Sequence, residues 1–81
     1  MTNPVIDEYG TKRWYNEKGQ LHRDNDKPAV VSAHGTKFWY QDGLKHRDGD
    51  KPAVIWARDS IWARGSKEWW QNGKCIKRVN G

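Results

Sequence analysis

The sequence predicts an all-β protein made of tandem antiparallel β-hairpin repeats that form a single curved or rolled sheet. One observation is an internal repeat: GTKRWYN at residues 10–16 returns as GTKFWYQ at 35–41, and HRDNDKPAVV at 22–31 returns as HRDGDKPAVI at 46–55. A second is the absence of a long stretch with the apolar spacing of an amphipathic helix, while Gly or Pro interrupts the chain every few residues.

Each unit is expected to contain two extended runs separated by turns. In the second copy, residues 36–41 form one expected strand and residues 53–57 another, with turns at His34-Gly35 and Asp42-Gly43. Lys-Pro at 27–28 and 51–52 marks the start of a strand, where a missing N–H is tolerated. The pattern therefore predicts a hairpin in every copy.

A third copy opens at Gly65 as GSKEWWQNG but lacks the His-Arg-Asp and Lys-Pro-Ala-Val blocks, as expected of a terminal cap in a repeat array. Before it, IWARDS at 55–60 is followed at once by IWARGS at 61–66. That duplication predicts a strand extension, an extra hairpin or a protruding loop. We expect one repeat domain over 1–81, with unit 1 at about 5–31, unit 2 at about 32–57, the insertion at 55–66 and the capping unit at 65–81.

The recurring tryptophans are the expected core, because stacked hairpins must bury something large. Trp14, Trp39 and Trp69 occupy one equivalent position in the three copies. The neighbouring position, on the opposite face of the strand, differs between copies and is the better place to look for specificity. It holds Arg13, Phe38 and Glu68, and we call the face that carries these residues the variable face.

Composition narrows the class of protein. The single cysteine, Cys75, excludes an intrachain disulfide and favours a reducing cytoplasm, and no signal peptide or membrane-spanning run is visible. A formal net charge of +5 favours an anionic partner such as nucleic acid, a nucleotide or an acidic protein surface. We expect no enzyme activity and no cofactor, since Cys75 has no His in its own unit to act as a base.

The repeated His-Arg-Asp blocks allow two interpretations. As scaffold, Arg23 and Arg47 pair with nearby aspartates and pin successive turns; as a site, they form a cationic row with His22 and His46 that suits phosphate oxygens. The Asp-x-Asp pairs that follow favour Asx-type turns over a divalent cation site, because further acidic ligands are missing. No metal is expected.

The duplicated stretch is the first choice for a binding site, because it breaks the repeat. It holds Trp56 and Trp62 with Arg58 and Arg64 at equal spacing, and Phe38 lies on the variable face. Alternating Trp and Arg suit stacking on a base with neutralisation of a phosphate, and equally suit a protein-binding hot spot.

With the blocks Gly-x-Lys-x-Trp-Tyr/Trp, His-Arg-Asp and Asp-Lys-Pro-Ala-Val in place, the chain resembles the variant MORN-type β-hairpin repeats of small bacteriophage proteins over roughly residues 10–81. The resemblance implies a string of hairpins, a phage or prophage origin and frequent self-association. The expected function is a non-catalytic binding protein, acting in the cytoplasm of a bacterial host, that captures nucleic acid or a nucleotide-type defence signal. Alternatives are an inhibitor that binds a host protein and a purely structural repeat protein; open hairpin edges also allow a homodimer.

Overall fold

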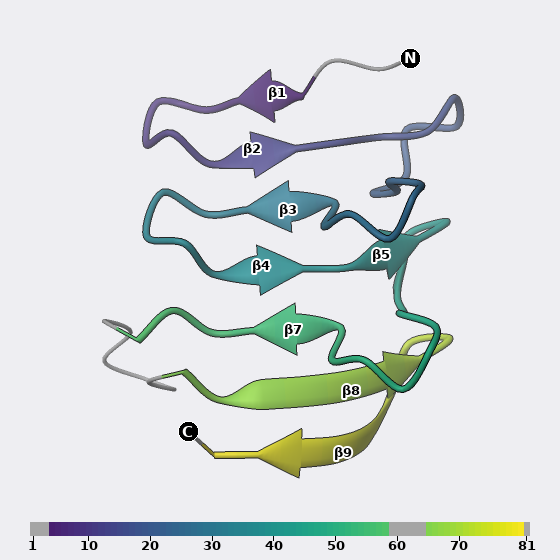
Figure 1. Ribbon diagram of the computed structural model, residues 1–81. Helices are drawn as coiled ribbons and strands as arrows, with labels where there is room; N and C mark the ends of the chain where they lie inside the picture. Colours follow the sequence, from purple (N-terminus) through teal and green to yellow (C-terminus); the bar gives the residue numbers. More distant parts are fainter. Residues whose placement is uncertain (1–3, 59–64, 81) are drawn as a thin grey trace.

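The computed structural model describes residues 4–58 and 65–80, and in these it confirms an all-β fold of sequential hairpins without a helix (Figure 1). The larger sheet is antiparallel and has seven strands in the order β1-β2-β3-β4-β7-β8-β9, and β5 pairs with β6 in a small second sheet. The strands are β1 (Val5–Ile6), β2 (Lys12–Arg13), β3 (Val30–Val31), β4 (Lys37–Phe38), β5 (Tyr40–Gln41), β6 (Leu44–Lys45), β7 (Val54–Ile55), β8 (Lys67–Gln71) and β9 (Lys74–Val79). Because β1 and β9 lie at opposite edges, the sheet is open.

The hairpin turns follow from local backbone chemistry. Asp42 and Gly43 have φ values of 51° and 83°, and Asn72 and Gly73 have φ values of 51° and 84°. Two successive residues in the left-handed region make the tight turn whose twist suits a two-residue hairpin, for which Asp-Gly and Asn-Gly are the favoured pairs. The turn predicted at Asp42-Gly43 is therefore confirmed.

The sheet is a single layer, so its tryptophans are covered by cationic side chains rather than by a second sheet. Trp14 and Trp39 are buried, and Trp69 is half-buried. The Arg23 guanidinium lies 3.7 Å from the Trp14 ring centroid, and the Arg47 guanidinium lies 3.9 Å from that of Trp39. Small or β-branched residues fill the space beside them, namely Ala29, Val30, Ala53 and Val54.

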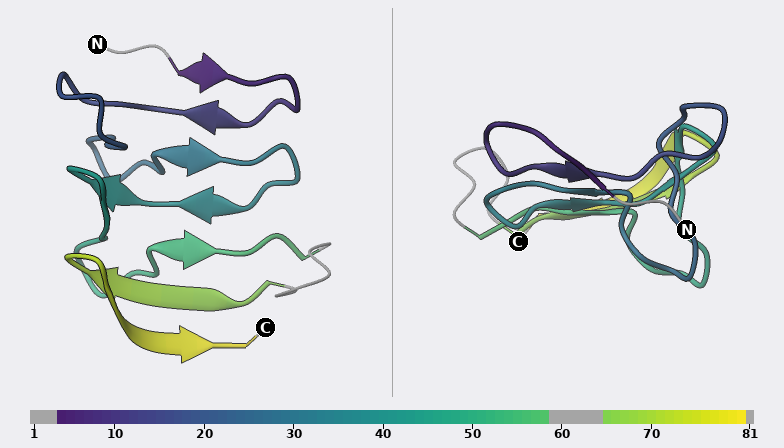
Figure 2. Two further views of the ribbon diagram at one scale, coloured as in Figure 1. Left: turned by 180° about the vertical axis from the view of Figure 1, so that it is seen from behind. Right: turned by 90° about the horizontal axis from the view of Figure 1, so that it is seen from above.

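Two sets of turns leave one end of the sheet in different directions, as the view from above shows (Figure 2). One set contains the hairpin tips, such as Asp42-Gly43. The other contains the His-Arg-Asp segments, which leave the sheet after residues 21 and 45 and rejoin it at Ala29 and Ala53. We call the second set the loop arm, residues 22–28 and 46–52.

The third unit has no such loop, and its two strands stay paired beyond the point where the loop arm leaves the other units. β9 pairs with β8 from Gln71↔Lys74 to Lys67↔Val79, with one irregularity between Trp69 and Trp70. The ammonium of Lys77 then lies 4.8 Å from the Trp69 ring centroid, the position that Arg47 takes over Trp39. Loss of the loop therefore replaces the arginine cover with a lysine.

The duplicated insertion lies in the connection between β7 and β8. The Trp56 N–H donates to the Ser66 carbonyl at 2.9 Å, and the Gly65 N–H donates to the Ala57 carbonyl at 3.1 Å. The same kind of bond, from the Ser32 N–H to the Thr36 carbonyl, closes the hairpin of the preceding unit. The hairpin register is thus kept on both sides of the insertion, and residues 59–64 lie outside the described part.

Candidate functional site

The His-Arg-Asp segments form the contacts between successive units. His22 accepts a hydrogen bond at Nδ1 from the Asp42 N–H of the next unit at 3.1 Å, and its Nε2 lies 2.9 Å from Asp24 Oδ1. Because Nδ1 accepts, the geometry places the proton of a neutral ring on Nε2, which then donates to Asp24. His46 makes the equivalent pair of contacts, with the Asn72 N–H and with Asp48.

Both arginines of these segments are also held in place. The Nη1 of Arg47 donates to the Pro52 carbonyl at 3.0 Å, and its Nε and Nη2 bind the Asp26 carboxylate of the preceding unit at 2.9 and 3.3 Å. Arg23 donates to the Pro28 carbonyl at 3.2 Å. The structure therefore gives His22, Arg23, His46 and Arg47 scaffold contacts, which favours the scaffold interpretation of these blocks.

The ionised form of Asp26, the aspartate at the centre of this contact, is stabilised by its cationic partners. Hydrogen bonds from Arg47 and from Lys51, whose Nζ lies 2.8 Å from Asp26 Oδ2, hold the pKa of Asp26 well below its ordinary value of 3.8. Asp50 has the equivalent place in the second unit, but no cationic partner for its carboxylate exists in the described part of the chain. The unit-to-unit ion pair therefore occurs once among the described residues.

The variable face carries an aromatic cluster, which brings Phe38 and Trp56 together as two of the predicted site residues. Their ring centroids lie 5.7 Å apart in an edge-on arrangement, and both side chains are half-buried. Arg58 is exposed at the start of the connection to β8, while Trp62 and Arg64 lie outside the described residues. The predicted alternation of Trp and Arg on one surface is therefore traced only as far as Arg58.

Sequence reasoning missed the residue that organises this cluster. The carboxylate of buried Glu68 accepts hydrogen bonds from the indole N–H groups of Trp56 at 3.0 Å and Trp70 at 2.9 Å. Burial raises the pKa of Glu68, but these two bonds, with Arg78 and Lys45 nearby, more than offset it and hold the pKa below the usual 4.5. The sequence held one signal for Glu68: it is the acidic residue at a position that Arg13 and Phe38 occupy in the other copies.

The opposite face carries a row of lysines that alternate with aliphatic residues. Strand pairing places Lys12 opposite Val31, Lys37 opposite Ile55 and Lys67 opposite Val79. All three lysines are exposed. Since partners in register share a face, one line across the sheet collects seven residues without a carboxylate, namely Ile6, Lys12, Val31, Lys37, Ile55, Lys67 and Val79. We call this line the lysine row.

Other chemistry finds little support in the described residues. No group of three or more His, Cys, Asp or Glu side chains in residues 4–58 and 65–80 is placed to hold a metal ion. In the same part of the chain, no helix is long and apolar enough to cross a bilayer. Comparison with known proteins gives no match to a family model, to a curated protein or to a solved structure.

Proposed function

We propose that this protein is a non-catalytic binding protein that captures nucleic acid on the face of its sheet that carries the lysine row. The observation that supports it is the repetition of one exposed lysine per hairpin unit along a line that contains no carboxylate. Alternate strands of a sheet lie about 9.5 Å apart, so the ammonium groups are spaced at regular intervals along a direction that a polyanion can follow.

Charge segregation supports the same proposal. Most carboxylates of the described chain lie in the loop arm and in turns, for example Asp24, Asp42 and Asp48, away from the lysine row. The net charge of +5 is thereby distributed unevenly, and the sheet face gains positive potential that attracts an anionic polymer. The resemblance to bacteriophage repeats directs the search for this partner to the bacterial host, where capture would counter a nucleic-acid-based defence.

The test is binding of a labelled single-stranded oligonucleotide, followed by fluorescence anisotropy over a range of salt concentrations. The double variant Lys37→Gln/Lys67→Gln should weaken binding and reduce the slope of log K against log salt by about 0.7 for each lysine that contacts a phosphate. The matched control is Lys18→Gln/Lys74→Gln, which removes the same charge from two exposed hairpin tips. Equal losses of affinity in both double variants would show that only the net charge matters, and would contradict a binding site at the lysine row.

A second candidate is binding of a host protein, which the aromatic cluster favours. Phe38, Tyr40, Trp56 and Trp70 are all half-buried on the variable face, and the Lys45 ammonium lies 4.4 Å from the Trp70 ring centroid. Tryptophan and tyrosine are enriched in protein-binding hot spots. A host protein that co-purifies with the wild type, is lost on Tyr40→Ser and is kept on Lys37→Gln/Lys67→Gln would favour this candidate over nucleic-acid capture.

A further inference from the structure

The second unit contains a carboxylate-binding site that is filled by the first unit. Arg47 and Lys51 bind the Asp26 carboxylate, through Nε, Nη2 and Nζ. The main-chain carbonyl of the same Asp26 accepts a hydrogen bond from the Trp39 indole N–H at 3.1 Å. One aspartate thus supplies both a side-chain and a main-chain acceptor to three donors of the following unit.

The first unit repeats these three donors, and it holds its arginine in the same orientation. Arg23 stacks on Trp14 as Arg47 stacks on Trp39, and its Nη1 donates to the Pro28 carbonyl as that of Arg47 donates to Pro52. In residues 4–58 and 65–80, however, no acceptor binds the remaining Arg23 nitrogens, the Lys27 ammonium or the Trp14 indole N–H.

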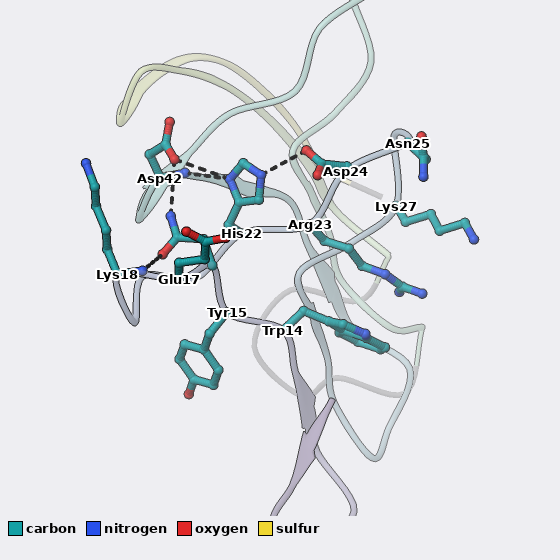
Figure 3. A pocket seen from close by; sticks show the side chains of 11 residues that line it. Trp14, Tyr15, Glu17, Lys18, His22, Arg23, Asp24, Asn25, Lys27 and Asp42 are labelled. Atoms are coloured by element: carbon teal, nitrogen blue, oxygen red, sulfur yellow. Dashed lines mark hydrogen bonds and ion pairs between the residues drawn. The ribbon is translucent and has the colours of Figure 1, made fainter. Parts of the chain in front are cut away.

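A pocket of about 550 Å³ lies at this position. Its lining includes Trp14, Arg23 and Lys27, and the close view shows Arg23 lying over Trp14, with Lys27 on the same side of the pocket (Figure 3). On the other side, Asp42 and Asp24 flank His22, which binds both segments. The donors that hold a carboxylate in the second unit therefore line an open pocket in the first.

We propose that this first-unit pocket binds an acidic peptide, with one carboxylate between Arg23 and Lys27 and the main-chain carbonyl of the same residue accepting from the Trp14 indole. The planar guanidinium offers two parallel donors that match a carboxylate. Three further carboxylates line the pocket, from Glu17, Asp24 and Asp42. With Lys18, Arg23 and Lys27 the lining holds as many cations as carboxylates, which disfavours a ligand with many negative charges such as a polyphosphate backbone. The ligand proposed here therefore differs in class from that proposed for the lysine row.

The probe is a peptide that copies the natural occupant of the second-unit site. An acetylated and amidated peptide with the sequence of residues 21–26, LHRDND, is titrated into the ¹⁵N-labelled protein while the Trp14 indole N–H signal is followed. We expect saturable shifts of the Trp14 and Arg23 side-chain signals at millimolar peptide. The same peptide with its last Asp replaced by Asn should bind about tenfold more weakly, because the charge-assisted hydrogen bonds are lost.

Variants separate the pocket from general charge and from folding. Arg23→Gln should abolish peptide binding, but it also removes the side chain that covers Trp14. The second variant is therefore Lys27→Gln, at an exposed position, which should weaken peptide binding by roughly three- to tenfold. Lys18→Gln, which lines the same pocket away from the three donors, should bind as the wild type does. Lys37→Gln/Lys67→Gln should also keep full peptide binding, whatever happens to nucleic-acid binding.

Three results would overturn the proposal. One is a Trp14 indole signal that does not move at saturating peptide concentration. Another is equal binding of the Asp-ended and Asn-ended peptides, which would show that no carboxylate is recognised. The third is a shift of the Arg23 signals with inorganic phosphate but not with the peptide, which would make the pocket a simple anion site.

Discussion

The guanidinium of Arg47 binds the carboxylate of Asp26 across the boundary between two repeat units, with Nε–Oδ1 and Nη2–Oδ2 distances of 2.9 and 3.3 Å. The Asp26 residue has φ 57°, in the left-handed region, and the loop arm holds this conformation while its carboxylate meets the next unit. Because Arg47 also covers Trp39 of its own unit, this contact couples the core of the second unit to the first unit.

Asp26→Asn should destabilise the protein, because it removes the charge that Arg47 and Lys51 share while leaving a residue that tolerates positive φ. We expect thermal unfolding monitored by circular dichroism to show a melting temperature lower by a few degrees. The matched control is Asp50→Asn, at the equivalent position with φ 57° but without a described cationic partner. An equal decrease in both variants would show that the ion pair contributes nothing to stability.

The contribution of this ion pair should depend on acid. The folded-state pKa of Asp26 lies below its unfolded value of about 3.8, so the stabilisation is complete above that value and is lost as the pH falls through the folded-state pKa. The difference in unfolding free energy between the wild type and Asp26→Asn should therefore be constant near neutral pH and shrink below about pH 4. Urea titrations of both proteins from pH 7 down to the acid limit of folding measure it, and a difference that grows in acid would contradict the assignment.

Glu68→Gln should unfold more readily, since a neutral amide has one oxygen to accept from two indole N–H groups. Its NH₂ group would face a donor, and one of Trp56 or Trp70 would lose its partner in a buried setting. We expect a decrease of about 1–2 kcal/mol in the free energy of unfolding, measured by urea denaturation with tryptophan fluorescence. Glu17→Gln, at an exposed position, is the control and should change the midpoint little.

Gly73→Ala should also destabilise the fold. Gly73 has φ 84°, and an added Cβ would lie 3.3 Å from Leu44 Cδ2 of the neighbouring hairpin. The left-handed backbone alone costs roughly 1–2 kcal/mol for an alanine. Asn72→Gly, at the preceding turn position with φ 51°, should be neutral or slightly stabilising in the same urea assay. A neutral Gly73→Ala would mean that the turn has relaxed to another type.

The elements that were predictable are those determined by neighbouring residues. Asp42-Gly43 specifies a tight hairpin turn from two residues alone, and the recurrence of Trp14 and Trp39 predicts a repeated core position. The face shared by Lys12 and Lys37 also follows from alternation along a strand. That an aliphatic residue stands between successive lysines depends on strand register, which is a property of the assembled sheet.

The parts that were not predictable depend on residues brought together from different units. Glu68 accepts from Trp56 at the other side of the insertion, and Asp26 meets Arg47 only after the loop arm leaves the sheet. Short apolar runs do not indicate where a strand begins or ends. The strand expected over residues 53–57 is therefore found only at Val54–Ile55. The stretch around Trp62 and Arg64 lies outside the described residues, and its role as a binding site remains a prediction from the sequence.

The loop arm of each complete unit contacts the hairpin tip of the unit that follows, as His22 does with Asp42 and His46 with Asn72. Sheet and loop contacts alike thus join adjacent units, and the number of units sets the size of the molecule. Splicing in another copy of residues 32–55 would lengthen the sheet by two strands and add one ammonium group about 9.5 Å further along. If the lysine row binds nucleic acid as proposed, the number of repeat units would set the number of phosphates contacted and so the length of polymer that is bound.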